Sequence, residues 1–220
     1  MTALRHDCPS TRHPASAHRP PVAESTAVWM LRADGRRHRL PVSRWMGAPD
    51  RADGVLLDAC RGATVDVGCG PGRLTAALTA RAVVALGIDT SATAVRMARR
   101  KGAAALRRSV FDPLPGESRW RHALVADGNI GIGGNPSALL RRLAALLAPG
   151  GTVLVETEPP GAGIRQEHVR LIRADAPAGP SFRWAWVAAD AMDSLAYAAG
   201  LVPRWSRSCD DRWFAELERQ

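Results

Sequence analysis

Residues 64–74 read Thr64-Val65-Asp66-Val67-Gly68-Cys69-Gly70-Pro71-Gly72-Arg73-Leu74. A short apolar run ends in a turn with three glycines, and Leu74, Ala77 and Leu78 mark one side of the segment that follows. This order indicates a buried strand, a glycine-rich turn and an amphipathic helix. Because glycine has no Cβ and adopts unusual φ values, such a turn lets a ligand approach the backbone closely. The motif is a candidate ligand-binding loop, and a simple tight turn is the alternative.

A second apolar run, residues 83–88, ends in Asp89, which lies 21 residues after Gly68. In nucleotide-binding sheets an acidic residue at this place accepts hydrogen bonds from the ribose hydroxyls. The dinucleotide fingerprint requires Gly-x-Gly-x-x-Gly, but here the third glycine comes one residue early, at Gly72. The spacing therefore favours a nucleoside-type ligand and disfavours a nicotinamide-dependent oxidoreductase.

Apolar runs and amphipathic segments alternate through most of the chain. Strands are predicted at 63–67, 83–88, 105–111, 122–126 and 152–156. Ser91 and Asn135 are predicted to cap two of the helices between them. Such repeats give a mostly parallel sheet with helices on both faces. Near the C-terminus only Asp210 and Asp211 separate two further runs, and so short a connection permits only an antiparallel hairpin.

Composition excludes several classes of protein. Of 220 residues, 46% are hydrophobic and 23% charged, which is typical of soluble proteins. No run approaches the roughly 18–20 apolar residues that span a bilayer, and residues 1–21 lack the apolar centre of a signal peptide. The four cysteines show no C-x-x-C spacing or zinc-ligand pattern, so we expect free thiols and no metal. We expect a cytoplasmic protein without membrane contact.

The chain carries 30 basic and 21 acidic residues, a net charge of +9. Such a charge can steer anionic ligands, but the arginines are scattered and Lys101 is the only lysine. A nucleic-acid partner is therefore not indicated by charge. We expect a disordered tail at 1–25 and a single domain at 26–220. Within that domain, 26–49 forms a basic arm or hairpin around Asp34-Gly35, and 159–187 is an insertion.

Together these motifs resemble the class I S-adenosylmethionine-dependent methyltransferases. Residues 65–72 are similar to their first motif, residues 87–91 to their second-strand acid, and residues 147–152 to the turn before their fifth strand. The resemblance spans 50–220. It implies an α/β, Rossmann-like, mostly parallel seven-stranded sheet with helices on both faces and a C-terminal antiparallel hairpin. It also implies S-adenosyl-L-methionine as the cofactor, bound across the carboxyl ends of the first strands.

The resemblance also implies where the cofactor is held. The glycine turn cradles its methionine portion, and Asp89 holds its ribose. Ser109 and Val110 stand where the family usually places an acidic residue near the adenine. The implied cofactor-binding residues are Asp66, Gly68, Cys69, Gly70, Gly72, Asp89, Thr90, Ser109, Val110, Asp127, Gly128 and Asn129. For residues 127–129 a simple turn is the alternative.

The loop after the predicted fourth strand bears on the acceptor. It has no Asn/Asp-Pro-Pro-aromatic or Pro-Cys signature, and Lys101 alone cannot furnish the lysine tetrad of ribose methylation. We therefore expect methyl transfer to a small-molecule acceptor. The alternatives are an RNA or protein methyltransferase and a non-catalytic S-adenosylmethionine-binding regulator. The catalytic residues are not identified by the sequence; Asp127 and His168 are the candidate bases.

Three aromatic residues alternate in the insertion: Phe182, Trp184 and Trp186. The period of two indicates a strand with its rings on one face. Such a face either roofs a planar or apolar acceptor or packs onto the sheet as core. A lone histidine such as His122 or His168 is more often structural than catalytic. The basic arm, with Arg36, Arg37, Arg39 and Trp45, is either solvated surface or a binding site for phosphate or nucleic acid.

Overall fold

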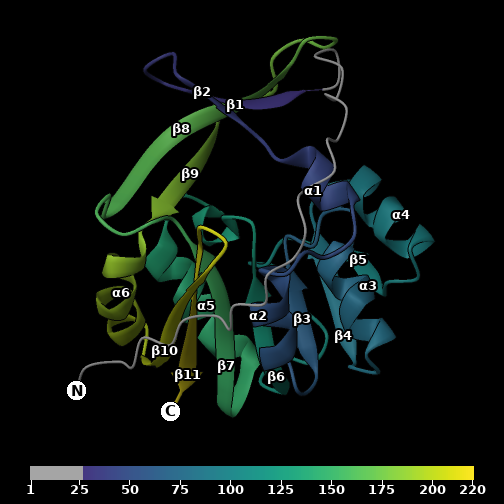
Figure 1. Ribbon diagram of the computed structural model, residues 1–220, viewed down its shortest axis with the longest axis vertical. Helices are drawn as coiled ribbons and strands as arrows, with labels where there is room; N and C mark the ends of the chain where they lie inside the picture. The colour runs from purple at the N-terminus through teal and green to yellow at the C-terminus, as the bar shows by residue number, and fades with distance from the viewer. Residues whose placement is uncertain (1–26) are drawn as a thin grey trace.

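The computed structural model describes residues 27–220. The predicted disordered tail at 1–25, with Cys8, lies outside the described residues. Two β-sheets and the helices around them make up the described part, and the smaller sheet stands above one end of the larger (Figure 1). Within residues 27–220 no helix is long and apolar enough to cross a membrane.

The larger sheet has seven strands in the order β10-β11-β7-β6-β3-β4-β5. Strands β7, β6, β3, β4 and β5 run parallel, whereas β11 is antiparallel to both β7 and β10. This confirms the predicted Rossmann-like sheet with its C-terminal antiparallel hairpin. The strands are β3 (Thr64–Val67), β4 (Ala85–Asp89), β5 (Ala105–Arg107), β6 (Trp120–Val125), β7 (Leu147–Thr157), β10 (Leu201–Cys209) and β11 (Arg212–Arg219).

The largest differences from the predicted strand lengths are in β5 and β7. Strand β5 ends at Arg107, because the Asp112 carboxylate accepts the Ser109 N–H at 3.1 Å and turns the chain there. Strand β7 begins at Leu147, which pairs with Trp120 across an irregularity in the register. A local side-chain hydrogen bond such as that of Asp112 competes with strand pairing, which explains the early end of β5.

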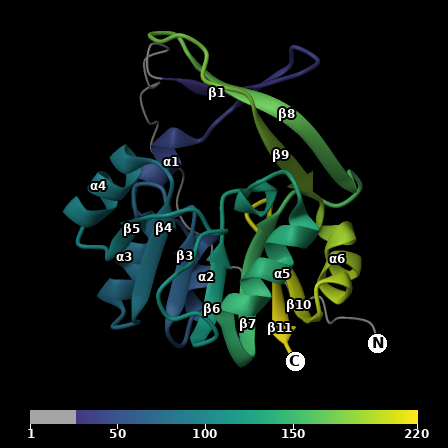
Figure 2. The same cartoon turned by 180° about the vertical axis from the view of Figure 1, so that it is seen from behind.

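Helices cover both faces of the larger sheet (Figures 1 and 2). Apolar side chains of α5 and α6 pack on one face, and those of α2 and α3 pack on the other. The predicted caps are confirmed: Ser91 Oγ accepts the Ala94 N–H and Asn135 Oδ1 accepts the Ala138 N–H. The helices are α2 (Asp53–Ala59), α3 (Arg73–Ala80), α4 (Ala92–Arg100), α5 (Pro136–Leu146) and α6 (Met192–Ala198), with 3-10 turns at Asn129–Gly131 and Ala189–Ala191.

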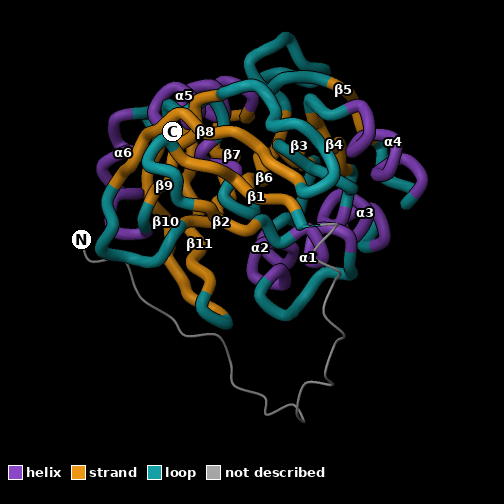
Figure 3. Tube along the Cα trace, turned by 90° about the horizontal axis from the view of Figure 1, so that it is seen from above, coloured by secondary structure: helices purple, strands orange, loops and turns teal. Residues whose placement is uncertain are grey.

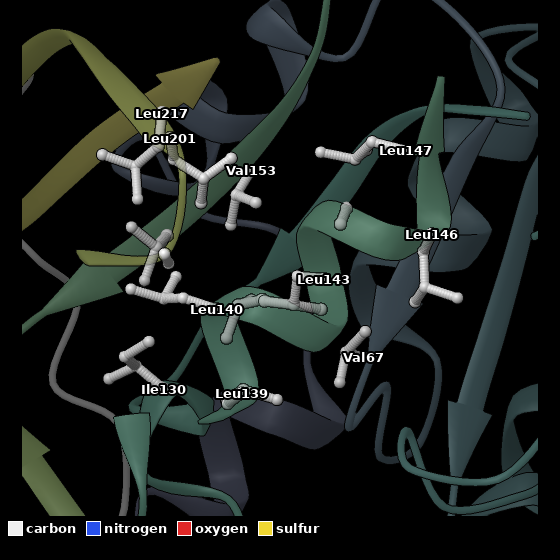
Figure 4. Close-up of a cluster of buried hydrophobic side chains, with 14 of the residues drawn as sticks. Val67, Ile130, Leu139, Leu140, Leu143, Leu146, Leu147, Val153, Leu201 and Leu217 are labelled. Carbon is white, nitrogen blue, oxygen red and sulfur yellow. The ribbon is translucent and has the colours of Figure 1, made fainter. Parts of the chain in front are cut away.

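The main core lies between α5 and the sheet. Four leucines of α5 are fully buried and turn toward sheet residues such as Val67 and Val153 (Figure 4). They recur at helical spacing, as Leu139, Leu140, Leu143 and Leu146. Fully burying one such side chain contributes about 1.5–3 kcal/mol. This packing fixes the strands whose carboxyl ends form the site.

The smaller sheet joins two segments that are far apart in the sequence. Its strands run in the order β2-β1-β8-β9, and β1 pairs antiparallel with β8 so that Met30 faces Leu171. Seen from above, β1 and β8 lie over the larger sheet (Figure 3). The strands are β1 (Val28–Arg32), β2 (Arg37–Arg39), β8 (Ile164–Arg173) and β9 (Phe182–Val187). We call this sheet the roof; the sequence did not predict that the arm and the insertion pair with each other.

An apolar cluster and an ion pair hold the roof together. Met30, Val169 and Trp186 are buried on the face that Phe182 and Trp184 share. At the β1–β8 pairing, the Arg32 guanidinium donates to both carboxylate oxygens of Glu167. Such two-pronged contacts add geometric specificity as well as energy. Helix α1 (Val42–Met46) then leads from the roof to the main domain.

The C-terminal hairpin has the turn predicted for it. Asp210 and Asp211 both have positive φ, 49° and 60°. Two-residue hairpin loops of this kind require φ > 0 at both positions, and aspartate tolerates it better than most residues. The hairpin places Arg212 beside the ends of β7 and α2, where it enters the ion network described below.

Candidate functional site

A pocket of about 710 Å³ opens at the carboxyl ends of the parallel strands, below the roof. Its floor comes from the ends of β3, β4 and β6 and the loop after β5, and its upper wall from β8 and β9. Ten of the predicted site residues line it: Asp66, Gly68, Cys69, Gly70, Asp89, Thr90, Ser109, Val110, Asp127 and Asn129. Gly72 and Gly128 do not.

The three glycines of the 68–72 loop have different tasks. All have positive φ, between 53° and 82°. A Cβ at Gly68 would lie 2.5 Å from the Asn129 amide nitrogen, and one at Gly72 would lie 2.7 Å from Ala98 of α4. A Cβ at Gly70 would meet nothing closer than 4.0 Å. Gly68 and Gly72 are therefore needed for packing, and Gly70 leaves open space beside the pocket.

Asp89 joins the two predicted parts of the site. One carboxylate oxygen accepts the Gly70 N–H at 3.0 Å, and the other accepts the Ser91 N–H at 2.7 Å. The carboxylate thus fixes the glycine loop directly. The helix cap of α4 belongs to Ser91, so capping is not the role of Asp89.

Asp66 is buried beneath the glycine loop. Its carboxyl accepts a hydrogen bond from the Thr75 hydroxyl at 2.6 Å, and burial raises its pKa to about 7. Burial also raises the pKa of the neighbouring Cys69 thiol far above its usual range. A thiol that stays protonated is a poor nucleophile. Cys69 therefore contributes shape to the pocket.

Asp127 is not free to act as a base, contrary to the sequence prediction. Its carboxylate is paired with Arg44 of α1 at 2.8 Å and with Arg73 of α3 at 2.6 Å. Its own backbone N–H donates to Glu156. Each of its two carboxylate oxygens is therefore engaged by a guanidinium group. Asp127 instead joins α1 and α3 to the loop after β6.

The ion network continues into the core. Arg73, only 4% exposed, also pairs with the fully buried Asp53. Arg212 of the hairpin contacts Asp53 at 3.0 Å and Glu156 at 2.8 Å. Burial lowers the pKa of Arg212, but its hydrogen bonds to Glu156 and the negative charges of Glu156, Asp50 and Asp127 together outweigh this, and the net shift is upward. The network locks six separate segments together below the pocket.

Asn129 supports the loop from the other side. Its amide nitrogen donates to the carbonyl oxygens of Val67 and Gly68 at 3.1 and 3.0 Å. This ties the end of β3 to the turn after β6. The adjoining Gly128 has a φ of 78° and open space around its Cα. Gly128 is therefore needed for the backbone turn, which agrees with the alternative that residues 127–129 form a simple turn.

The glycine-rich run that follows is explained by the roof. A Cβ at Gly131 would lie 2.1 Å from the Ala185 carbonyl oxygen and 2.6 Å from the Trp184 ring. One at Gly134 would lie 2.6 Å from the Arg183 Cβ. Ile132 also pairs with Trp184 in an isolated bridge. The run is needed so that β9 can rest directly on the loop after β6.

The three rings of the aromatic strand are divided between the pocket and the roof. Phe182 and Trp184 line the pocket, whereas Trp186 is buried in the roof against Met30 and Val169. His168, on β8, is exposed and does not line the pocket. The structure therefore contradicts its prediction as a candidate base.

His122 is structural. Its Nε2 accepts the Arg61 N–H at 3.1 Å, and its Nδ1 lies 2.9 Å from the Thr152 hydroxyl. It stands near the start of β6, at the end of the strand away from the pocket. Burial, helped by Arg121, lowers its pKa to about 4.

We expect His122 to make the fold sensitive to acid. Because the pKa is lower in the folded state, the stabilisation is complete above about pH 6.5 and is lost as pH falls through 4. Urea titrations at a series of pH values measure this as a fall in the free energy of unfolding. His122→Gln should flatten that fall. An unchanged slope in the variant would show that other groups cause it.

Comparisons with known proteins agree with this geometry. Residues 64–151 match the model of a family described as "Methyltransferase domain". A SAM-dependent methyltransferase from Bacteroides fragilis superposes with a TM-score of 0.75 at 19% identity, covering 88% of this chain and 87% of that one.

Residues 64–151 are therefore similar to a methyltransferase domain. Two curated relatives, both named trans-aconitate 2-methyltransferase, come from Paracidovorax citrulli and Methylobacterium radiotolerans. They are 34% and 37% identical over 51% and 61% of this chain, and the matches cover 45% and 49% of their own lengths. The chain thus matches about half the length of these relatives.

Part of the pocket lies outside the matched methyltransferase domain residues. Trp45, Leu171, Phe182 and Trp184 line it from the arm and the roof. Sequence reasoning missed Trp45 and Leu171 as pocket residues, and it missed Arg73 as an ionic anchor. Only Arg73 gave a signal in the sequence, because it occupies the position at which the dinucleotide fingerprint has its third glycine.

Proposed function

We propose that the pocket binds S-adenosyl-L-methionine and that the protein transfers its methyl group to a small-molecule acceptor. The observation that carries this is the contact of Asp89 with the Gly70 N–H beside open space at Gly70. The site belongs to a single methyltransferase domain at 26–220, in which β1 and β2 of the arm at 26–49 and β8 and β9 of the insertion at 159–187 form the roof.

The cofactor residues follow from the lining of the pocket. Asp89, with Thr90, would hold the ribose, and the open backbone at Gly70 would receive the methionine portion. Ser109 and Val110, after β5, would flank the adenine. Gly68, Asp127 and Asn129 would act by shaping this surface, because their side-chain or Cβ positions are taken up by contacts within the protein.

A small acceptor suits the enclosure of the pocket. Its volume of about 710 Å³ lies within the roughly 300–1,000 Å³ of small-molecule sites. Leu171, Phe182, Arg183 and Trp184 of the roof belong to its lining, and the roof stands above one end of the larger sheet (Figure 1). The names of two relatives and of a Burkholderia thailandensis structural neighbour, 1,6-didemethyltoxoflavin-N1-methyltransferase, refer to small molecules. That neighbour has a TM-score of 0.58 at 20% identity, covering 80% of this chain and 78% of its own.

Alignment is the main chemical task of this site. A bound sulfonium supplies an already activated methyl group. The protein has to hold the acceptor in line with it and keep water out, and such positioning is worth about 7–11 kcal/mol. Phe182 and Trp184 of the roof and Ile132 of the loop after β6 are placed to exclude water from this space.

Calorimetric titration tests the proposal. S-adenosylmethionine and S-adenosylhomocysteine are expected to bind to the full chain, and NAD is not, because the third glycine of the fingerprint is displaced. Gly70→Val is the matched variant: a branched side chain would fill the open space and abolish binding. Binding of NAD alone would contradict the proposal. Cofactor binding without transfer to any small acceptor would favour a non-catalytic S-adenosylmethionine-binding regulator. Transfer to RNA or protein would favour an RNA or protein methyltransferase.

A further inference from the structure

The pocket has two chemically different halves. The lower half, at the ends of β3, β4 and β6, contains its acidic residues, Asp66, Asp89 and Asp127. The upper half, which we call the roof half, contains no acidic residue. It is lined by Ile132, Gly133, Leu171, Phe182, Arg183 and Trp184.

The aromatic wall of the roof half is held in place. Trp184 lies against the bare backbone of Gly131, where a Cβ would come within 2.6 Å of its ring. Phe182 meets Trp184 edge to face, with ring centroids 6.2 Å apart and planes at 90°. Such a pair presents a rigid apolar surface to a ligand, and aromatic surfaces favour flat partners.

Two arginines flank the rim of this half. Arg108 lines the pocket after β5, and Phe111 of the same loop lies against Gly133, where a Cβ would be 3.0 Å from its ring. Arg183 of β9 also lines the pocket, and a Cβ at Gly134 would lie 2.6 Å from its Cβ. Within residues 27–220 neither guanidinium of this pair has an ion pair or hydrogen bond. Unpaired cations beside an apolar wall attract an anionic ligand.

The pocket offers no proton acceptor to the roof half. Among the described residues, its lining includes no histidine, lysine or tyrosine. The three aspartates of the lining all lie in the lower half, where Asp66 is bonded to Thr75, Asp89 holds the glycine loop and Asp127 is paired with two arginines. An acceptor bound here must therefore arrive with its attacking electron pair already free. A carboxylate does so at neutral pH, since its pKa is near 4.

We propose that the roof half binds a flat, apolar monocarboxylate and that the methyl group goes to its carboxylate oxygen. This rests on the proposed function. An oxygen of the acceptor attacks the methyl carbon, the O–CH₃ bond forms and the S–CH₃ bond breaks. The electron pair of the broken bond stays on sulfur, the two opposite charges cancel, and no proton moves. The products are a methyl ester and a neutral thioether.

Graded probes test the class of acceptor. With S-adenosylhomocysteine present, aromatic monocarboxylates from benzoate to cinnamate and 2-naphthoate are titrated against the full chain, followed by Trp fluorescence. At least one should bind, and with S-adenosylmethionine it should yield its methyl ester. Cinnamamide and cinnamyl alcohol have the same shape without the charge and should bind at least about ten-fold more weakly. The tricarboxylate trans-aconitate should also bind more weakly, because the wall is apolar.

Variants test the arginines. Arg108→Gln and Arg183→Gln should each raise the KM of the acid by about ten-fold or more, with kcat nearly unchanged. Arg37→Gln is the matched control, because it removes the same charge from an exposed position on β2 outside the pocket lining. Its KM should equal that of the wild type.

The possible failures are distinguishable. If the wild type does not bind S-adenosylhomocysteine, the proposed function fails. If it does, the inference is overturned by any of three results: no aromatic acid binds, the neutral analogues bind as well as the acid, or trans-aconitate is preferred. If Arg37→Gln changes the KM as much as Arg108→Gln and Arg183→Gln do, the effect comes from the overall positive charge of the protein. That result would overturn the assignment of Arg108 and Arg183 as the groups that bind the carboxylate.

Discussion

Replacing Arg73 by methionine is expected to lower the free energy of unfolding by about 3–5 kcal/mol. The guanidinium is buried and is paired with both Asp53 and Asp127. Methionine fills similar space but leaves the fully buried Asp53 carboxylate with Arg212 as its remaining guanidinium partner. Removing one partner of a buried pair is costly because the other charge stays desolvated. Urea denaturation at pH 7 measures the loss.

A surface ion pair near the same helix provides the control. Arg81, at the end of α3, contacts Asp58 at 2.7 Å, but both side chains are largely exposed. Arg81→Met should therefore cost less than about 1 kcal/mol. Adding Asp53→Asn to Arg73→Met should recover part of the loss by removing the stranded charge. Equal losses in the two single variants would contradict the buried network.

Asp89→Ala is expected to weaken binding of S-adenosylhomocysteine by roughly 10- to 150-fold, which corresponds to about 1.5–3 kcal/mol for hydrogen bonds to a charged group. The carboxylate holds the Gly70 N–H and would also receive the ribose hydroxyls. Its loss therefore removes a ligand contact and loosens the loop at once. Calorimetric titration of the variant measures the change.

Ser91→Ala is the matched control for this second prediction. Ser91 caps α4 through its hydroxyl, at 3.2 Å from the Ala94 nitrogen. Losing the cap should cost about 0.5–2 kcal/mol of stability without changing ligand affinity in the folded protein. If Asp89→Ala instead lowers the melting temperature and keeps wild-type affinity, Asp89 does not hold the ribose.

The larger sheet was predictable because its signals are local. Each strand–helix unit shows its hydrophobic period within about 25 residues, and the two-residue connection at Asp210-Asp211 allows one topology. Ser91 and Asn135 act on backbone groups three residues away. The glycine loop and Asp89 follow from the same short-range order.

The roof was not predictable because its pairing is distant. Arg32 and Glu167 are 135 residues apart in the chain, and neither period nor turn chemistry links them. Asp127 gave an equally incomplete signal. Its place at a strand end indicated a chemical role, but the arginines that occupy it come from α1 and α3. Charge pairing between separate segments is set by the fold and leaves no spacing in the sequence.

The distant pairing of β1 with β8 also sets an order of assembly. Closing so long a loop costs chain entropy before its contacts repay it, and contacts of high sequence separation form slowly. During synthesis the strands that bear the glycine loop can associate while β8 and β9 are still being made. The roof half of the pocket therefore takes shape after the strands that bear the glycine loop, and β1 has no partner in β8 until residues 164–173 have been made.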